Sequence, residues 1–342
     1  WVEFGRKGAK QEGFLKRFPS IETLFAERWY MDAFLDAVDE LHSSPTVAWR
    51  VLNLLKDPEF DVRDVETHLE ADPALTASIL RLVNSAAYGL PRRISSLRQA
   101  IMLMGARSLR LAVLSFGLVD RLTRGTPAQV YDDFWRRALT TAVAAARLSR
   151  EVQRCSADEA YSAGLLADLG VLVLAQVDTN QYVKIYTKHP HGTTLQDAET
   201  SRYGFSHAAL GGRLLSRWGI PNPLPLAAAN HHLPPVGDAL LLQSVYAGTL
   251  LADVLWTAGS PLLPKIQEFL ERHFDFDLDR FIDLAMECKA DIADAAEMFA
   301  VRIEGDIDCR RLRHEAARRF REEAIDTAID YDGVTAVLDQ DF

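Results

Sequence analysis

One aspartate and two histidines in separate segments are the first residues of this chain that could do chemistry. Asp168 stands in a strongly apolar stretch, His207 follows a serine at the start of a predicted helix, and His231 ends another predicted helix. Neutral imidazoles and carboxylates are common protein ligands of divalent cations. The three side chains could therefore capture a divalent ion weakly. The alternative is that both histidines are structural residues, hydrogen-bonded in the core.

Signatures of other common active sites are missing from the sequence. It contains no Gly-x-x-x-x-Gly-Lys-Ser/Thr phosphate loop and no Gly-x-Ser-x-Gly nucleophile motif. The three cysteines, Cys155, Cys288 and Cys309, are far apart and form no Cys-x-x-Cys pair. This spacing argues against a cysteine-based zinc site and fits a reducing compartment.

Composition describes an ordinary globular protein with an acidic surface. The chain has 342 residues, of which 48% are hydrophobic, and a formal net charge of −10. A negative protein gains little from DNA or RNA phosphates, so we expect no nucleic-acid partner. The first twenty residues lack the apolar run of a signal peptide, and apolar stretches such as 170–177 are too short to span a bilayer. We therefore expect a cytoplasmic location without membrane attachment.

Helical periodicity extends along almost the whole chain, and strand-like alternation is nearly absent, which predicts an all-α fold. Asp72 before Pro73 is a helix-start signal, and Ser156 with Glu159 has capping-box spacing. This capping box opens a predicted continuous core helix over 160–177, which contains Asp168. A long helix over 128–152 carries an alanine run at 142–146 that would let another helix pack closely.

The remaining helices are predicted from the same period. They are a helix that begins at Pro45 and helices over 74–83, 96–105, 108–122, 181–188, 194–203, 206–218, 226–231, 238–256, 279–301 and 308–329. The last of these alternates arginine with glutamate, which is typical of a solvated helix with salt bridges, although an interaction surface is the alternative.

Several separated motifs resemble one family in its own order. They are Asp72-Pro73-Ala74-Leu75-Thr76, the run from Leu80 to Gly89, the run from Ile94 to Ile101, and Leu103-Met104-Gly105. Together they resemble the HDOD family, the HD-related output domain, over residues 37–258. The resemblance implies an HD-like multi-helical bundle, with an N-terminal helical part over 37–125 and an HD-like part over 126–258. Residues 1–36 would be a truncated linker, and 259–342 a C-terminal helical extension.

The HD superfamily holds its metal with a histidine, an adjacent His-Asp pair and a distal aspartate. Carried onto this sequence, these positions fall at Arg137, at Ala167 with Asp168, and at Asp253. Two of the four ligands are thus replaced, one of them by a cation. We expect the Arg137 guanidinium to lie near Asp168 or Asp253 and to replace the lost ion electrostatically, since its planar fork can bind a carboxylate bidentately. The alternative is that Arg137 points to solvent.

The resemblance adds further candidate residues. His207 and His231 would complete the vestigial pocket formed by Arg137, Ala167, Asp168 and Asp253. A possible interaction surface consists of Asn84, Tyr88, Arg92 and Arg93. For the first two the structural alternatives are that Asn84 binds free carbonyl groups at a helix end and that Tyr88 packs beneath the turn.

The resemblance implies a non-enzymatic bacterial signalling domain that acts as a protein-interaction or signal-relay scaffold, as in two-component regulatory systems. Its partners would be signalling proteins or fused receiver and diguanylate cyclase domains, and the C-terminal helices could form a homodimer. We expect no catalytic residue and no cofactor beyond weak or adventitious divalent metal. The alternatives are a residual metal-dependent phosphohydrolase and a domain that senses a nucleotide or cyclic dinucleotide.

Overall fold

The computed structural model describes most of the chain between residues 31 and 319. The described residues are 31–37, 46–55, 57, 59–84, 88, 90–123, 125–153, 155–189, 192–299 and 301–319. Within these ranges every regular element is a helix and there is no strand. The predicted all-α class is therefore confirmed.

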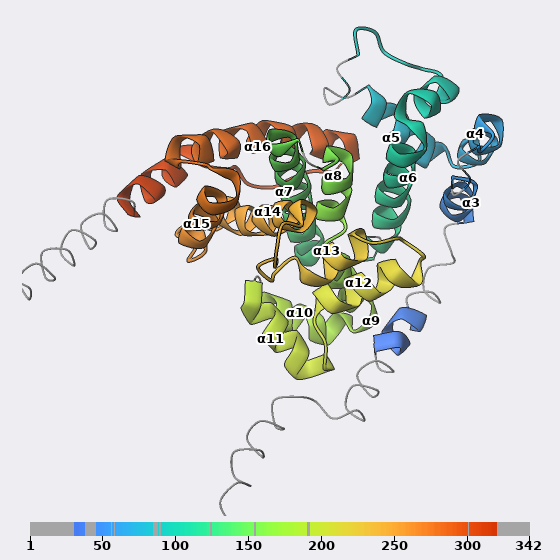
Figure 1. Ribbon diagram of the computed structural model, residues 1–342. Coiled ribbons are helices and arrows are strands. Elements are labelled where there is room, and N and C mark those ends of the chain that lie inside the picture. Colours follow the sequence, from blue (N-terminus) through green and yellow to red (C-terminus); the bar gives the residue numbers. More distant parts are fainter. Residues whose placement is uncertain are drawn as a thin grey trace, which may run out of the picture.

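The helices are numbered as in Figure 1. They are α3 (Thr46–Leu54), α4 (Val62–Glu70), α5 (Pro73–Val83), α6 (Leu97–Thr123), α7 (Ala128–Val152), α8 (Ala157–Leu165), α9 (Leu169–Val177), α10 (Thr179–Lys188), α11 (Gly192–Tyr203), α12 (His207–Arg217), α13 (Leu224–Asn230), α14 (Leu240–Trp256), α15 (Leu263–Phe274) and α16 (Leu278–Phe299). Shorter helical segments cover 31–37 and 309–319.

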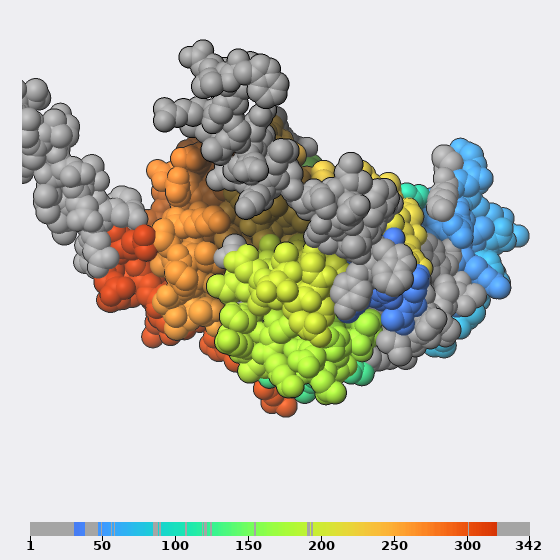
Figure 2. All heavy atoms as spheres, turned by 90° about the horizontal axis from the view of Figure 1, so that it is seen from below, coloured from blue at the N-terminus to red at the C-terminus, as the bar shows by residue number. Residues whose placement is uncertain are grey.

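Helices α7, α8 and α14 form the centre of the molecule, where they pack directly on one another. Figure 1 shows α3 to α6 on one side of this centre, α15 on the other, α16 across the top and α9 to α13 below. Seen from below, α10 and α11 form a yellow-green lobe on the surface (Figure 2).

Small residues allow the central helices to approach closely. A Cβ atom added to Gly164 of α8 would lie 2.8 Å from the Ala142 Cα atom, and one added to Gly248 of α14 would lie 2.7 Å from the Thr141 carbonyl oxygen. Both neighbours are on α7, at the start of its alanine run. The predicted close packing at this run is therefore confirmed.

The continuous helix predicted over 160–177 is wrong. Helix α8 ends at Leu165, α9 begins at Leu169, and Asp168 is the residue that precedes α9. A Cβ atom on Gly170 would lie only 2.0 Å from the carbonyl oxygen of His207, so this glycine lets α12 reach the start of α9. Buried apolar residues lie on both sides of the break, so the hydrophobic pattern does not show where α8 ends and α9 begins.

Residues 97–123 form one element with a sharp bend. Gly105 lies inside α6 with φ 70° and ψ 171°, a backbone conformation that is readily available only to glycine. The two helices predicted at 96–105 and 108–122 are thus the two arms of α6.

The C-terminal extension packs against the rest of the fold through α16. Arg147 of α7 forms ion pairs of 2.7 Å with both Glu287 and Asp291. From α5, the Nε atom of Arg81 donates a hydrogen bond of 3.0 Å to the Met298 carbonyl oxygen. The helix predicted over 308–329 is observed over 309–319, and the rest of it lies outside the described residues.

One segment is long and apolar enough, by length and composition alone, to span a membrane. Residues Ala157–Val177, which include α8 and α9, contain an 18-residue window with a mean hydropathy of 1.6, and the two arms of α6 taken together are also long and apolar enough for a span. The expectation that no stretch is long enough is thus wrong. However, 83% of the apolar window within Ala157–Val177 is buried inside the fold, as in the core helix of a soluble protein.

Candidate functional site

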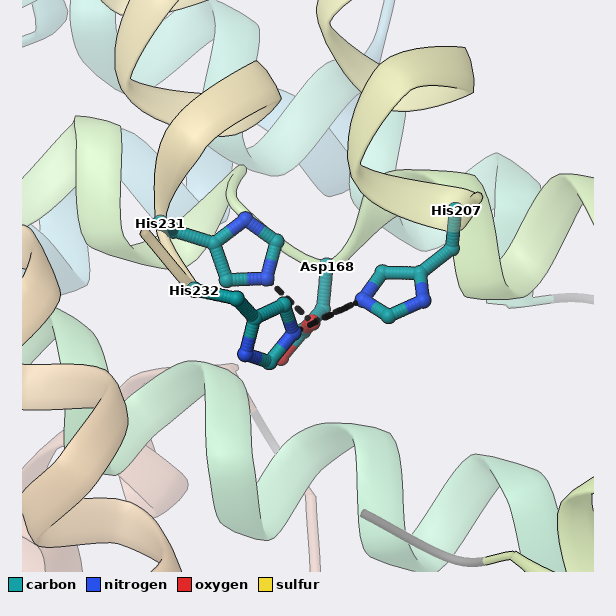
Figure 3. A group of neighbouring side chains, drawn as sticks. All are labelled: Asp168, His207, His231 and His232. Carbon is teal, nitrogen blue, oxygen red and sulfur yellow. Dashed lines mark hydrogen bonds and ion pairs between the residues drawn. The ribbon is translucent and has the colours of Figure 1, made fainter. Parts of the chain in front are cut away.

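Three histidines surround Asp168 in the interior of the protein (Figure 3). The Asp168 Oδ1 atom lies 3.1 Å from the Nε2 atom of His231 and 3.4 Å from the Nε2 atom of His207. The Nε2 atoms of His207 and His232 are 3.0 Å apart. One potential ligand atom from each of the four residues lies within 4.8 Å of the others. We refer to Asp168, His207, His231 and His232 as the His-Asp cluster.

Helix ends bring the cluster together. Asp168 lies in the break between α8 and α9, and His207 is the first residue of α12, whose N-cap Ser206 accepts a hydrogen bond from the Ala209 amide. His231 follows the last residue of α13. The side chains of Asp168, His207 and His231 are buried. The site therefore forms where helices begin and end, and not along the face of a single helix.

A second layer of acceptors fixes the orientation of two imidazole rings. The Nδ1–H group of His207 donates to Glu199 Oε2 at 2.7 Å, and the Tyr182 hydroxyl donates to Glu199 Oε1 at 2.7 Å. The Nδ1–H group of His231 donates to the Ala228 carbonyl oxygen at 2.7 Å. These acceptors assign the proton to Nδ1 in both rings, so both Nε2 atoms face Asp168. Such second-layer partners are typical of metal-ligating histidines.

This orientation is unfavourable unless a proton or a cation lies inside the cluster. In neutral rings with Nδ1 protonated, the Nε2 atoms carry lone pairs, and they would face an Asp168 oxygen that can also only accept. A proton on a ring or a cation between the atoms removes this conflict. The residues present therefore fit a cation, either as imidazolium or as a bound divalent metal ion.

Charge balance around the cluster supports the same conclusion. Three carboxylates are buried, those of Asp168, Glu199 and Asp253, and one guanidinium, that of Arg137, is buried with them. Two negative charges would remain without compensation in a low-dielectric interior, where isolated charges are costly. An imidazolium at His207 would compensate one of these charges, and a divalent ion in the cluster would compensate both.

Arg137 lies between the two aspartates of the predicted pocket. Its Nε atom is 3.8 Å from Asp168 Oδ2, and its Nη1 atom is 4.0 Å from Asp253 Oδ2. The predicted proximity is confirmed, and the alternative that Arg137 points to solvent is wrong, since the residue is only 6% exposed. The expected bidentate fork is not formed, because each carboxylate meets a single nitrogen beyond hydrogen-bond distance. Whether the guanidinium replaces an ion remains a prediction.

The surroundings change the acidity of three cluster residues. Burial opposes the charged form of Asp168, but hydrogen bonds with the His207 and His231 rings, which form when their Nε2 atoms are also protonated, outweigh burial and hold the pKa of Asp168 well below its usual range. Burial also opposes protonation of His207, yet the Glu199 charge and hydrogen bonds with both carboxylates raise its pKa to about 9. Burial and the two neighbouring histidines hold the pKa of His232 well below normal. One proton is therefore favoured on His207.

The cavity beside the cluster is very small. Its volume is about 10 Å³, and its lining includes Phe134, Arg137, Asp168, His207 and His232. A cavity of this size has room for about one water molecule. Pockets for small molecules are typically about 300–1,000 Å³, so this cavity is far smaller than such a pocket.

The structure gathers all six residues of the predicted pocket in one region. Ala167, buried beside Asp168, brings no ligand atom to it. Three residues of the observed site were not predicted from the sequence: His232, Glu199 and Tyr182. The adjacency of His232 to His231 was a usable signal. Nothing local marks Glu199 or Tyr182, because their hydrogen bonds join separate helices.

The four residues of the predicted interaction surface differ in their contacts and exposure. The Asn84 amide donates to the carbonyl oxygens of Leu80 and Ile94, and its Oδ1 atom accepts from the Ile94 amide, each at 2.7 Å. Asn84 is therefore used to close its own loop, as in the structural alternative. Tyr88 is half-buried against the core, and Arg92 and Arg93 are exposed. A role for these three residues in partner binding stays a prediction.

Comparisons with known proteins identify the family. Residues 41–234 match the HDOD domain. A protein of Treponema pallidum (strain Nichols), described as uncharacterized, is 26% identical over an alignment of 210 residues, and the match covers 58% of this chain but only 39% of that protein.

Two solved structures show the same fold. An HDOD domain protein with unknown function from Geobacter sulfurreducens has a TM-score of 0.59 and 22% identity, covering 81% of this chain and 97% of its own. A protein of Shewanella amazonensis SB2B, provisionally named a metal-dependent phosphohydrolase, has a TM-score of 0.55 and 20% identity. The match covers 78% of this chain and 99% of that protein. The HDOD match extends over more than half of the 342 residues, and the chain therefore belongs to the HDOD family.

Proposed function

We propose that this protein is a non-enzymatic regulatory domain that relays a signal between protein partners. The closed site carries the proposal. The cavity at the His-Asp cluster has a volume of about 10 Å³, and Arg137 occupies the position where the HD resemblance places a metal-ligating histidine. A substrate phosphoester would have to reach this site, and nothing of that size fits. Membership of the HDOD family supports a regulatory role.

The donor set suits one divalent metal ion that stabilises the fold. Asp168, His207, His231 and His232 offer one carboxylate and three imidazoles. A bound divalent ion could in principle activate water for attack on a phosphoester. Four protein ligands complete the coordination of a structural zinc site, whereas catalytic zinc sites keep one position open. We therefore propose a structural role for any ion held here.

A residual metal-dependent phosphohydrolase is the second candidate, and the preformed His-Asp cluster favours it. The likeness to the Shewanella protein does not decide between the two candidates, because at 20% identity it concerns the fold alone. Arg137 and Ala167 argue against this candidate, since they remove two of the four HD ligands. The small cavity argues equally against a nucleotide sensor at this site.

Hydrolysis assays with metal-loaded protein separate the candidates. The substrates would be bis(p-nitrophenyl) phosphate and cyclic dinucleotides, with Mn²⁺, Fe²⁺ or Zn²⁺ added and bound metal quantified by mass spectrometry. The proposal expects no turnover that depends on the cluster, so wild type and Asp168→Ala give the same background rate. Turnover by the wild type that disappears in Asp168→Ala and persists in an exposed-histidine control, His314→Ala, would establish the phosphohydrolase instead.

A further inference from the structure

Exposed apolar side chains gather at α13 and the loop after it. Of the six large hydrophobic side chains that are exposed in the described part of the chain, three lie here: Leu226 is 46% exposed, Leu233 54% and Val236 96%. Asn230 ties the first two together, because its side chain donates to the Leu226 carbonyl oxygen and its own carbonyl oxygen accepts from the Leu233 amide. We refer to these three hydrophobic residues as the α13 patch. Such a patch is typical of a surface that another segment or protein covers.

The first described residues of the chain lie on the helix next to α13. Residues 31–37 are helical and contact α12 through two ion pairs. Asp32 pairs with Arg213 at 3.2 Å. Asp36 pairs with Arg217 at 2.6 Å. Helix α12 in turn packs directly on α13. The described chain therefore begins one helix away from the α13 patch.

The direction of residues 31–37 points their first residue to the same end of α12 as the patch. The two ion pairs occur in the same order along both helices, so Met31 lies toward the start of α12 at His207. The loop of the patch begins at this end too, because the ring centroids of His207 and His231 are 5.5 Å apart and Leu233 follows two residues later. A segment that precedes Met31 thus starts close to the loop of the patch.

The sequence before the described residues carries an apolar face. Ser20 is a helix-start signal, and Ile21, Leu24 and Phe25 follow it at helical spacing. A helix from Ser20 to Tyr30 would be about 16 Å long, which exceeds the usual distance of about 8–10 Å between packed helices. A segment tethered so close to an apolar surface has a high effective concentration there, which favours it over a free partner.

We propose that residues 20–30 of the same chain dock on the α13 patch as an amphipathic helix. Leu233 directly follows His232, so the docked segment would contact the loop that leaves the His-Asp cluster. It would connect this cluster with residues outside the HDOD match at 41–234. The docking does not depend on the relay function proposed above, so either proposal can fail alone.

Photo-crosslinking in the full chain tests the occupant. A p-benzoylphenylalanine in place of Phe25 puts a photoreactive group on the apolar side of the predicted helix, and peptide mapping after irradiation identifies its neighbour. We expect crosslinks within one chain to residues 224–238. The same group in place of Glu27, on the opposite side of the predicted helix, should give few of them. Crosslinks between two chains, or none to residues 224–238, would overturn the proposal.

Hydrogen exchange tests the surface. In the wild type, the amides of residues 20–30 should exchange at least about tenfold more slowly than in a synthetic peptide of the same residues. Leu226→Asp combined with Leu233→Asp changes two exposed side chains and should remove this protection, whereas Met286→Asp, at an exposed position of α16, should retain it. Exchange as fast as in the peptide, or full protection in the double variant, would show that the segment does not dock on α13.

Discussion

His207 is joined twice to the same oxygen of Glu199. Its backbone amide donates to Glu199 Oε2 at 2.8 Å, and its ring Nδ1–H donates to that atom at 2.7 Å. Glu199 is fully buried and also accepts the hydroxyl hydrogen of Tyr182. One carboxylate thus fixes both the start of α12 and the ring that faces Asp168.

Glu199→Gln should destabilise the protein by about 2–4 kcal/mol, because it removes the charge that two buried donors of His207 require. Tyr182→Phe is the matched control and should cost about 1 kcal/mol, since it removes one neutral donor. Urea unfolding measures both values. A Glu199→Gln variant as stable as Tyr182→Phe would show that the double contact does not support the cluster.

Arg137→Leu should cost about 3–5 kcal/mol, because it leaves Asp168 and Asp253 buried without their cation. Arg150→Leu lies on the exposed face of the same helix and should change the free energy of unfolding by less than about 0.5 kcal/mol. Equal stability of the two variants would mean that the guanidinium does not neutralise the buried aspartates.

Divalent metal should stabilise the protein through the His-Asp cluster. A metal concentration about 100 times the Kd contributes about 3 kcal/mol to a folded state that alone binds the ion. We expect Zn²⁺ or Mn²⁺ to raise the Tm of chelator-treated wild type but not that of Asp168→Asn or His231→Ala. His314→Ala, which changes an exposed histidine, should respond like the wild type. The same Tm rise in Asp168→Asn would place the bound ion elsewhere.

Gly170→Ala should disrupt the cluster from its edge. The added Cβ atom would lie 2.0 Å from the His207 carbonyl oxygen, so α12 would have to move away from α9. We expect a loss of about 2–3 kcal/mol or more and loss of metal-induced stabilisation. Gly211→Ala, whose closest contact would be 3.2 Å, should cost less. The reverse order of stability would contradict this account of how α9 and α12 pack.

Periodicity alone predicted the all-α fold and most helix positions, because core helices carry their apolar residues at regular spacing. It missed the break before Leu169, since residues on both sides of the break are buried and apolar. The proximity of Arg137 to Asp168 or Asp253 was predicted from the HDOD resemblance, and its position between both is seen only in the structure. The role of Glu199 could not be predicted, because hydrogen bonds between separate helices leave no periodic signal in the sequence.

The central claim is that the His-Asp cluster is closed to substrates. The most direct test is the rate of bis(p-nitrophenyl) phosphate hydrolysis by protein with metal bound at the cluster, compared with Asp168→Ala under the same conditions. Our account predicts equal background rates for the two proteins. Turnover that requires Asp168 and increases in proportion to the bound metal would contradict it.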